Sequence, residues 1–141
     1  MVKITFRKLS VWSLFTFIVL FVFASLCSSP DEKGLGKGFT FFGDYNSHIY
    51  YWEKGDSLTV FIPPEVLSYY NTTEIILVKQ HPHRFDEAVY PRFYQYPYGR
   101  DTVYYWFVDK NTKDYIGPLL YSEMETYLKD KDLANMLKKL N

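Results

Sequence analysis

The segment EIILVK at residues 74–79 places four consecutive aliphatic side chains between two charged ones. Isoleucine and valine are β-branched and favour the extended backbone of a strand. Because consecutive strand residues point to opposite sides, four apolar residues in a row predict a strand that is buried on both faces. We therefore place this strand near the centre of a sheet.

Along the rest of the chain, short segments of β-branched and aromatic residues alternate with turn formers, which is typical of antiparallel strands. One hairpin is expected to end at Pro63 and Pro64, because proline has no N–H group for the ladder. Residues 65–70 predict a helical turn, and Gly117-Pro118 should end the last strand. The expected strands are residues 48–52, 58–62, 74–79, 102–108, 113–116 and, as an edge strand or an irregular loop, 88–98.

The C-terminal region predicts helix. Ser122 and Glu125 have the S-x-x-E spacing of a capping box, and Asp132 can cap a second apolar stripe. We expect two short helices or one kinked helix over the sheet. The predicted fold class is α+β, with an antiparallel sheet of five or six strands and C-terminal helical cover, preceded by an N-terminal hydrophobic signal or anchor helix. Residues 39–141 form its single domain.

Residues 1–27 have the order of an export signal. Lys3, Arg7 and Lys8 form a positive start, and the following residues up to Pro30 carry no charge. A helix of a globular domain would show polar residues at helical spacing, but this segment is apolar on every side. We therefore expect it to place an extracytoplasmic domain at a cell envelope, with the segment in contact with the membrane.

Cys27 is the single cysteine of the chain and closes the apolar run, so no internal disulfide can form. Residues 24–27, ASLC, resemble the lipobox of bacterial lipoproteins, in which the cysteine becomes the lipidated first residue. Leu26 departs from that pattern, which has a small residue before the cysteine. Three outcomes stay open for the segment: lipidation of Cys27, retention as a transmembrane anchor, or simple cleavage.

Residues 28–38 contain serine, proline, charged residues and three glycines, with Leu35 as the single large apolar side chain. This composition is typical of a flexible linker. We expect a tether that holds the domain off the membrane.

Charge argues against nucleic acid as a partner. Three of the 16 basic residues lie in the N-terminal segment, which leaves 13 against 16 acidic residues in the rest of the chain. A nucleic-acid binder needs a basic face that neutralises phosphates. With 48% hydrophobic residues, the chain is also too apolar to be disordered.

His81 and His83 flank Pro82 and are weak candidates for metal ligation, with Asp86 or Glu87 as a nearby oxygen donor. A zinc site needs three or four protein ligands, and the sequence offers only one further histidine. We expect loop histidines and no cofactor. The serines lack the context of a nucleophile, and the adjacent carboxylate pairs are typical of solvated loops, so the sequence predicts no enzyme.

Aromatic and arginine side chains gather in one proline-interrupted stretch. Tyrosine and arginine together are enriched at binding surfaces, where they supply area and hydrogen bonds. Core packing is the alternative use of such aromatics. The candidate binding residues are Tyr90, Arg92, Phe93, Tyr94, Tyr96, Tyr98 and Arg100.

Several short motifs between residues 43 and 128 resemble a family of small bacterial lipoproteins that is known only as a domain of unknown function. They are Gly43-Asp44-Tyr45, Ile62-Pro63, Val78-Lys79-Gln80-His81-Pro82 and the stretch from Tyr104-Tyr105 to Gly117-Pro118-Leu119. The resemblance implies a bacterial envelope location and carries no catalytic residue across.

The expected function is that of an uncharacterised cell-envelope lipoprotein with a binding or structural role, whose protein or glycan partner is unknown. Two alternatives stay open. One is a small periplasmic inhibitor or immunity protein, and the other is a metal-dependent hydrolase that uses His81 and His83.

Overall fold

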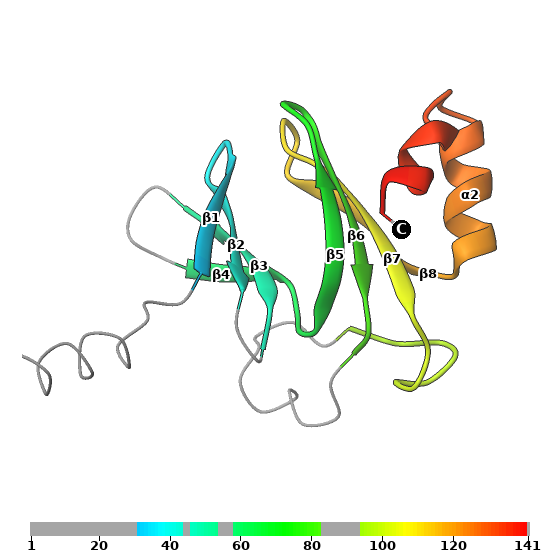
Figure 1. Cartoon of the computed structure of the whole chain (residues 1–141), viewed down its shortest axis with the longest axis horizontal. Coiled ribbons are helices and arrows are strands. Elements are labelled where there is room, and N and C mark those ends of the chain that lie inside the picture. Colours follow the sequence, from blue (N-terminus) through cyan, green and yellow to red (C-terminus); the bar gives the residue numbers. More distant parts are fainter. Residues whose placement is uncertain (1–30, 44–45, 54–57, 83–93, 141) are drawn as a thin grey trace, which may run out of the picture. The chain divides into compact units, whose positions relative to one another are not determined.

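The computed structural model describes residues 31–43, 46–53, 58–82 and 94–140. The chain divides into two compact units, Met1–Pro30 and Asp31–Asn141, and the described residues all belong to the second. Their strands form two four-stranded antiparallel sheets that keep the order of the chain (Figure 1). The first sheet contains β1 (Asp31–Gly36), β2 (Phe39–Gly43), β3 (His48–Trp52) and β4 (Leu58–Ile62). The second contains β5 (Val66–Asn71), β6 (Ile75–Gln80), β7 (Tyr104–Asp109) and β8 (Asp114–Leu119).

Two short helical segments end the chain, the α-helix α2 (Tyr121–Lys129) and the 3-10 helix η2 (Ala134–Lys139). The α+β prediction of one sheet with five or six strands is therefore wrong. In the described part of the chain, eight strands in two sheets make the fold mostly β. The sequence patterns did not reveal β1, β2 or β5. The N-terminal helix of that prediction lies outside the described residues.

The prediction of a flexible tether at residues 28–38 is also wrong, because most of these residues belong to the first sheet. Strand β1 begins at Asp31, and Leu35 is buried in the core. The glycines that suggested a linker form the turn to β2: Gly36, Lys37 and Gly38 have φ angles of 89°, 53° and 86°. Glycine adopts positive φ without a steric penalty, which is why two of them are found in this tight connection.

Strand β5 replaces the helical turn that was expected at residues 65–70. Its side chains alternate between the two faces: Tyr69 packs against the core between the sheets, and Tyr70 packs on the opposite side. Pairing with β6 supplies the hydrogen bonds of its backbone. This pairing partner lies beyond a turn, so local sequence preference did not decide the conformation.

Strand β8 continues through Gly117 and Pro118 to Leu119, so the expected end of the ladder at Gly117 is wrong. The register shifts between Tyr105 and Phe107 of the paired strand β7, which accommodates the irregularity. Residues 94–98, the described part of the uncertain segment 88–98, contain no strand.

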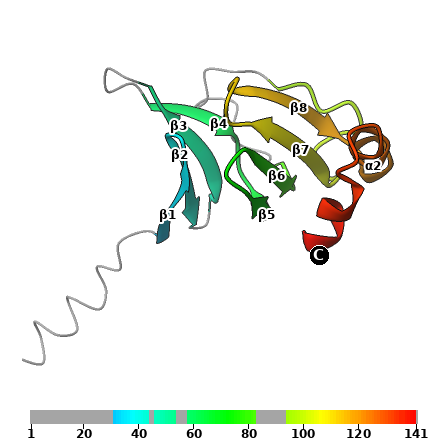
Figure 2. The ribbon, with the colours of Figure 1, turned by 90° about the horizontal axis from the view of Figure 1, so that it is seen from above.

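The two sheets face each other across a shared core (Figure 2). Both sheets contribute side chains: Leu35, Phe39, Ile49, Tyr51, Phe61 and Ile62 from the first, and Val66, Ile76, Val78, Trp106 and Val108 from the second. A second core lies on the other face of the second sheet, under α2 and η2. It contains Ile75, Leu77, Tyr105, Phe107, Met124, Leu128, Leu137 and Leu140.

Strand β6 contributes to both cores, as its uninterrupted apolar sequence predicted. Ile76 and Val78 point into the core between the sheets, and Ile75 and Leu77 point toward the helices. The strand lies between β5 and β7. Its predicted burial on both faces is confirmed.

Gln80 fixes the segment that links the two sheets. Its side chain is fully buried and accepts a 2.6 Å hydrogen bond from the Trp106 indole N–H. Its amide group donates to the carbonyl oxygens of Pro63 and Pro64, at 2.8 and 3.2 Å. Since prolines have no N–H to anchor this link, the glutamine supplies the polar contacts that hold it.

Lys110 joins the two sheets near the start of β6, at the opposite end of that strand from Gln80. Its ammonium group is buried and donates to the carbonyl oxygens of Leu35 and Thr72 and to the Asn71 side chain. Three acceptors match the three donors of an ammonium group, which offsets the cost of burying the charge. The turn after β7 is thereby held against both β1 and the turn after β5.

Helix α2 begins with a different cap from the one predicted. The Glu123 carboxylate accepts a 2.7 Å hydrogen bond from the backbone N–H of Leu120. Ser122 lies inside the first turn, where its carbonyl oxygen accepts from the Thr126 hydroxyl. The predicted pairing of Ser122 with Glu125 is wrong because the helix starts two residues earlier than that pattern requires.

Candidate functional site

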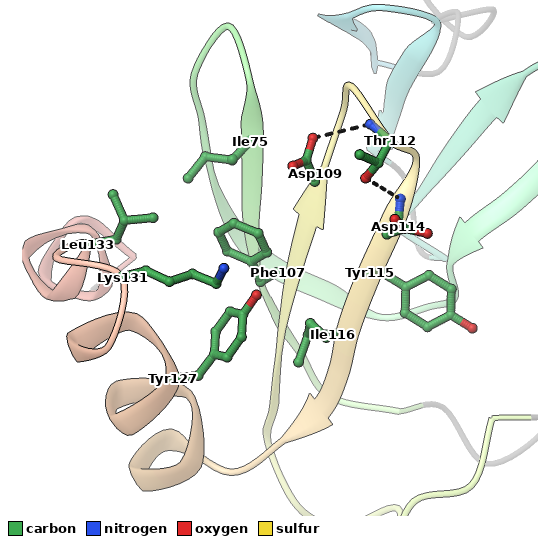
Figure 3. Close-up of a pocket in the computed structure, with 10 residues that line it drawn as sticks. All are labelled: Ile75, Phe107, Asp109, Thr112, Asp114, Tyr115, Ile116, Tyr127, Lys131 and Leu133. Carbon is green, nitrogen blue, oxygen red and sulfur yellow. Dashed lines mark hydrogen bonds between the residues drawn. The ribbon is translucent and has the colours of Figure 1, made fainter.

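A pocket of about 650 Å³ lies between strands β7 and β8 and the helical segment beside them (Figure 3). It occupies the part of the outer face of the second sheet next to the end of α2. The lining residues come from β6, from the β7–β8 hairpin and from α2 with the turn that follows it: Ile75, Phe107, Asp109, Thr112, Asp114, Tyr115, Ile116, Tyr127, Lys131 and Leu133.

The walls of this pocket are apolar. Phe107 and Ile116 are partners on adjacent strands, so their side chains lie on the same face of the sheet. The Tyr127 ring packs edge-on against Phe107, with 5.4 Å between the ring centroids. Ile116 remains 40% exposed, which leaves apolar surface for a ligand to cover.

Charged groups lie along one side of the pocket. Asp109 and Asp114 are paired residues of the β7–β8 hairpin. The Asp109 carboxylate accepts hydrogen bonds from the backbone N–H groups of Asn111 and Thr112, at 2.8 and 3.3 Å, and so shapes the turn. The Thr112 hydroxyl accepts from the Asp114 N–H at 3.3 Å, and Figure 3 shows both contacts with Thr112.

Lys131 supplies the positive charge of the pocket. Its ammonium nitrogen lies 5.2 Å from the centroid of the Tyr127 ring, in range of a cation–π interaction. Two carboxylates and one ammonium give the lining a net negative charge. An apolar group that carries a positive charge is the ligand chemistry that this lining favours.

Sequence reasoning missed this pocket. Asp109 and Thr112 were assigned to a hairpin turn, and that turn is present. The apolar walls come from three segments that are distant in the chain, and no spacing rule brings Ile75, Phe107 and Leu133 together. The sequence shows only that the apolar Ile116 lies near Asp109 and Asp114, which did not indicate a pocket.

The aromatic and arginine residues predicted to bind a partner are only partly described, because Tyr90, Arg92 and Phe93 lie outside the described ranges. Tyr94 is half-buried, donates a 2.8 Å hydrogen bond to the Phe61 carbonyl oxygen and packs edge-on against Trp106. It thus ties the segment after residue 93 to both sheets. These contacts give Tyr94 a structural role and leave the binding prediction untested.

Tyr96 and Arg100 also contact their own neighbourhood. The Tyr96 hydroxyl accepts from the Gln80 amide at 3.1 Å, and its ring packs 5.2 Å from that of Tyr104. The Arg100 guanidinium lies 5.2 Å from the centroid of the Tyr96 ring. The segment therefore packs around the buried Gln80 group.

Tyr98 is the most exposed of the described candidates, with 54% of its surface accessible. Its hydroxyl donates to the Glu123 carboxylate at 3.3 Å. The negative charge of Glu123 raises the pKa of Tyr98. Of the described members of this set, Tyr98 alone offers a large accessible ring for a partner.

The histidine candidates do not form a described cluster. His81 exchanges two backbone hydrogen bonds of 2.9 Å with Glu65, which extends the β5–β6 pairing. His83 and the lipidation candidate Cys27 lie outside the described residues. Within the described ranges, no group of three histidine, cysteine or acidic side chains is arranged to hold a metal ion.

Neither helical segment in the part of the chain that the structure describes, from residue 31 onward, has the length and hydrophobicity needed to cross a membrane.

Comparison with protein-family models, with curated proteins and with solved structures gave no significant match.

Proposed function

We propose that this protein is a membrane-anchored component of a bacterial cell envelope, and that its β domain binds a partner protein in the pocket beside α2. Anchoring is supported by the cation-led apolar segment at residues 1–27 and by Cys27 at its end. The binding role rests on one observation, the pocket of about 650 Å³ with apolar walls and an acidic side.

The charges of the pocket indicate what the partner presents. Lysine and arginine combine an apolar stem with a cationic end. The stem can cover Phe107 and Ile116 while the cation approaches Asp114, whose carboxylate is exposed. We infer that the bound group is a basic side chain of an exposed segment in another envelope protein.

Binding is tested with two short peptides, acetyl-Leu-Lys-Leu-amide and acetyl-Leu-Gln-Leu-amide, added to the full-length protein in detergent micelles. Amide NMR signals of the β7–β8 hairpin and the end of α2 should shift with the lysine peptide. The glutamine peptide should bind roughly threefold to tenfold more weakly, as expected for the loss of one partly exposed charge pair.

The Asp114→Asn variant should remove the preference for lysine, and Asp130→Asn should retain it. Asp130 is an exposed acid at the end of α2 that does not line the pocket. Equal binding of both peptides, or shifts confined to other parts of the domain, would refute the pocket assignment. Intact-mass measurement of the membrane-extracted protein tests the anchor, since a cleaved chain without lipid contradicts it.

A further inference from the structure

Two opposite charges flank the apolar wall of the pocket. Asp114 is the first residue of β8, and Lys131 lies in the turn after α2. Within the described ranges, neither side chain takes part in an ion pair, whereas Lys129, two residues before Lys131, pairs with Glu125 at 3.2 Å. Figure 3 shows Lys131 and Asp114 on opposite sides of the Phe107 ring. The pocket therefore has a cationic end and an anionic end.

The β7–β8 hairpin positions the anionic end. Phe107 pairs with Ile116, and two residues further along the hairpin Asp109 pairs with Asp114. Residues two apart on a strand share a face and lie about 7 Å apart, so the acidic pair follows the apolar pair on the outer face of the sheet. The Asp109 carboxylate already accepts two backbone hydrogen bonds in the turn. The carboxylate of the exposed Asp114 is thus the better placed of the two to attract a ligand cation.

The turn after α2 positions the cationic end. The N–H groups of Asp132 and Leu133 donate to carbonyl oxygens of the last helical turn, at 3.1 and 2.8 Å, and Asp132 has a φ of 57°. These are the two hydrogen bonds of a Schellman motif, which closes the C-terminal end of a helix. The backbone of Lys131 lies inside this closed turn, and its ammonium nitrogen lies 5.2 Å from the centroid of the Tyr127 ring. An exposed cation–π contact is weak, so a ligand carboxylate can compete for this ammonium group.

A lysine at the C-terminus of a polypeptide matches both ends of the pocket. Its ammonium group is attracted by Asp114, and its α-carboxylate is attracted by Lys131. The four-carbon stem between these two groups covers the apolar wall. A lysine inside a chain has a neutral peptide group in place of the carboxylate, and so gives Lys131 no opposite charge.

We propose that the pocket binds the C-terminal lysine of a partner polypeptide, with the lysine ammonium at Asp114 and the terminal carboxylate at Lys131. This inference rests on the proposed function, which places a basic side chain in the same pocket, and adds that this side chain belongs to the last residue of the partner. A volume of about 650 Å³ is in the range of pockets that hold a drug-sized ligand. Ile75 and Leu133 also line the pocket and provide apolar surface for the residue before the lysine.

The test compares the peptide acetyl-Leu-Leu-Lys with a free terminal carboxylate and the same peptide as an amide. Each is titrated into the full-length protein in micelles of an uncharged detergent, and the dissociation constant is taken from the amide NMR shifts of the β7–β8 hairpin and the end of α2. The free acid should bind roughly threefold to fivefold more tightly than the amide, as expected for one added, partly exposed charge pair.

Two lysine variants supply the matched comparison. Lys131→Met should remove the preference for the free acid, because the peptide carboxylate then meets only the carboxylates of the pocket. Lys129→Met removes the same charge from the same end of α2, but at a lysine that does not line the pocket, and should retain the preference. Both lysines are exposed, so both variants should keep the fold, which their amide spectra check. Equal loss of the preference in both variants would assign it to the general charge of the region and overturn the inference.

A third peptide, acetyl-Leu-Leu-Gln with a free carboxylate, separates this inference from the proposed function. A wild type that prefers lysine to glutamine but binds the free acid and the amide equally refutes the C-terminal position and leaves the basic side chain in the pocket. A wild type that does not distinguish lysine from glutamine refutes the proposed function and this inference with it. Nα-acetyl-lysine is the final control, since binding as tight as that of the tripeptide acid would overturn a polypeptide as the source of the ligand.

Discussion

The Lys110 ammonium group donates a 2.7 Å hydrogen bond to the carbonyl oxygen of Leu35, a residue 75 positions earlier in the chain. The contact joins the β7–β8 turn of the second sheet to β1 of the first. Lys37, in the turn after β1, also donates to the Asn111 side chain. Lys110, after β7, thus contacts β1, and Lys37, in the turn after β1, contacts the turn after β7.

Replacing Lys110 with methionine should lower the free energy of unfolding by roughly 2–4 kcal/mol, because the carbonyl oxygens of Leu35 and Thr72 lose a charged donor. Urea unfolding followed by circular dichroism measures the change. Lys138→Met is the control, since Lys138 is exposed. A loss below about 1 kcal/mol for Lys110→Met, similar to that of a surface lysine, would contradict the role of the contact.

Stability should also depend on pH through this lysine. Burial lowers the pKa of Lys110, and the nearby Lys37 ammonium lowers it further. The unfolded chain then binds more protons than the folded chain at pH values between the lowered pKa and 10.5, the ordinary value for lysine. The contribution of this group to the free energy of unfolding therefore rises with pH across that window.

The measurement compares urea-unfolding free energies of the wild type and Lys110→Met at a series of pH values up to 10.5. Other titrating groups are common to both proteins, so the difference isolates Lys110. The stability gap should widen as the pH rises. A gap that narrows would mean that the folded protein holds this proton more tightly than the unfolded chain.

Gly117→Ala should destabilise the fold by roughly 2–4 kcal/mol, through overpacking and an unfavourable positive φ. An added Cβ would lie 2.7 Å from the Trp106 ring and 2.8 Å from the Tyr105 carbonyl oxygen, and φ is 139°. Gly34→Ala offers the comparison, because its Cβ would meet nothing within 4 Å and its φ is not positive. Thermal unfolding should separate the two variants, and equal midpoints would show that the strand can shift at Gly117.

Gln80→Leu should cost roughly 2–3 kcal/mol, since it leaves the Trp106 indole N–H and two proline carbonyl oxygens without their partner in a buried site. Loss of the indole hydrogen bond should also change the near-ultraviolet circular dichroism of Trp106. The exposed Gln95 provides a control substitution to leucine. An unaltered spectrum with native stability would mean that the link between the sheets is held by other contacts.

The strands that the sequence revealed are those with dense β-branched and aromatic side chains. Strands β3 and β4 were predicted with their observed bounds, and β6 and β7 were displaced by one or two residues. Side chains of these strands are buried on one or both faces, so their apolar composition indicates in the sequence which residues form the core. Pro63 and Pro64 end β4 for the reason predicted, the lack of a backbone donor.

The missed strands depend on partners rather than on local composition. Strand β1 holds one buried apolar residue, Leu35, and two glycines, so it resembles a linker until β2 pairs with it. Strand β5 follows two prolines and gains its ladder from β6. The pocket was hidden for a similar reason, because its walls are assembled from β6, β7, β8 and α2.

The sequential order of strands within each sheet has a consequence for the route of folding. Neighbouring strands in a sheet are also neighbours along the chain, and sequence-local hairpins close quickly because little loop entropy is lost. We therefore expect the docking of the two sheets to follow their formation, and each undocked sheet exposes the aromatic and aliphatic side chains of the shared core. Chains in that state should associate at high protein concentration, because the exposed apolar side chains can pack between molecules as well as within one.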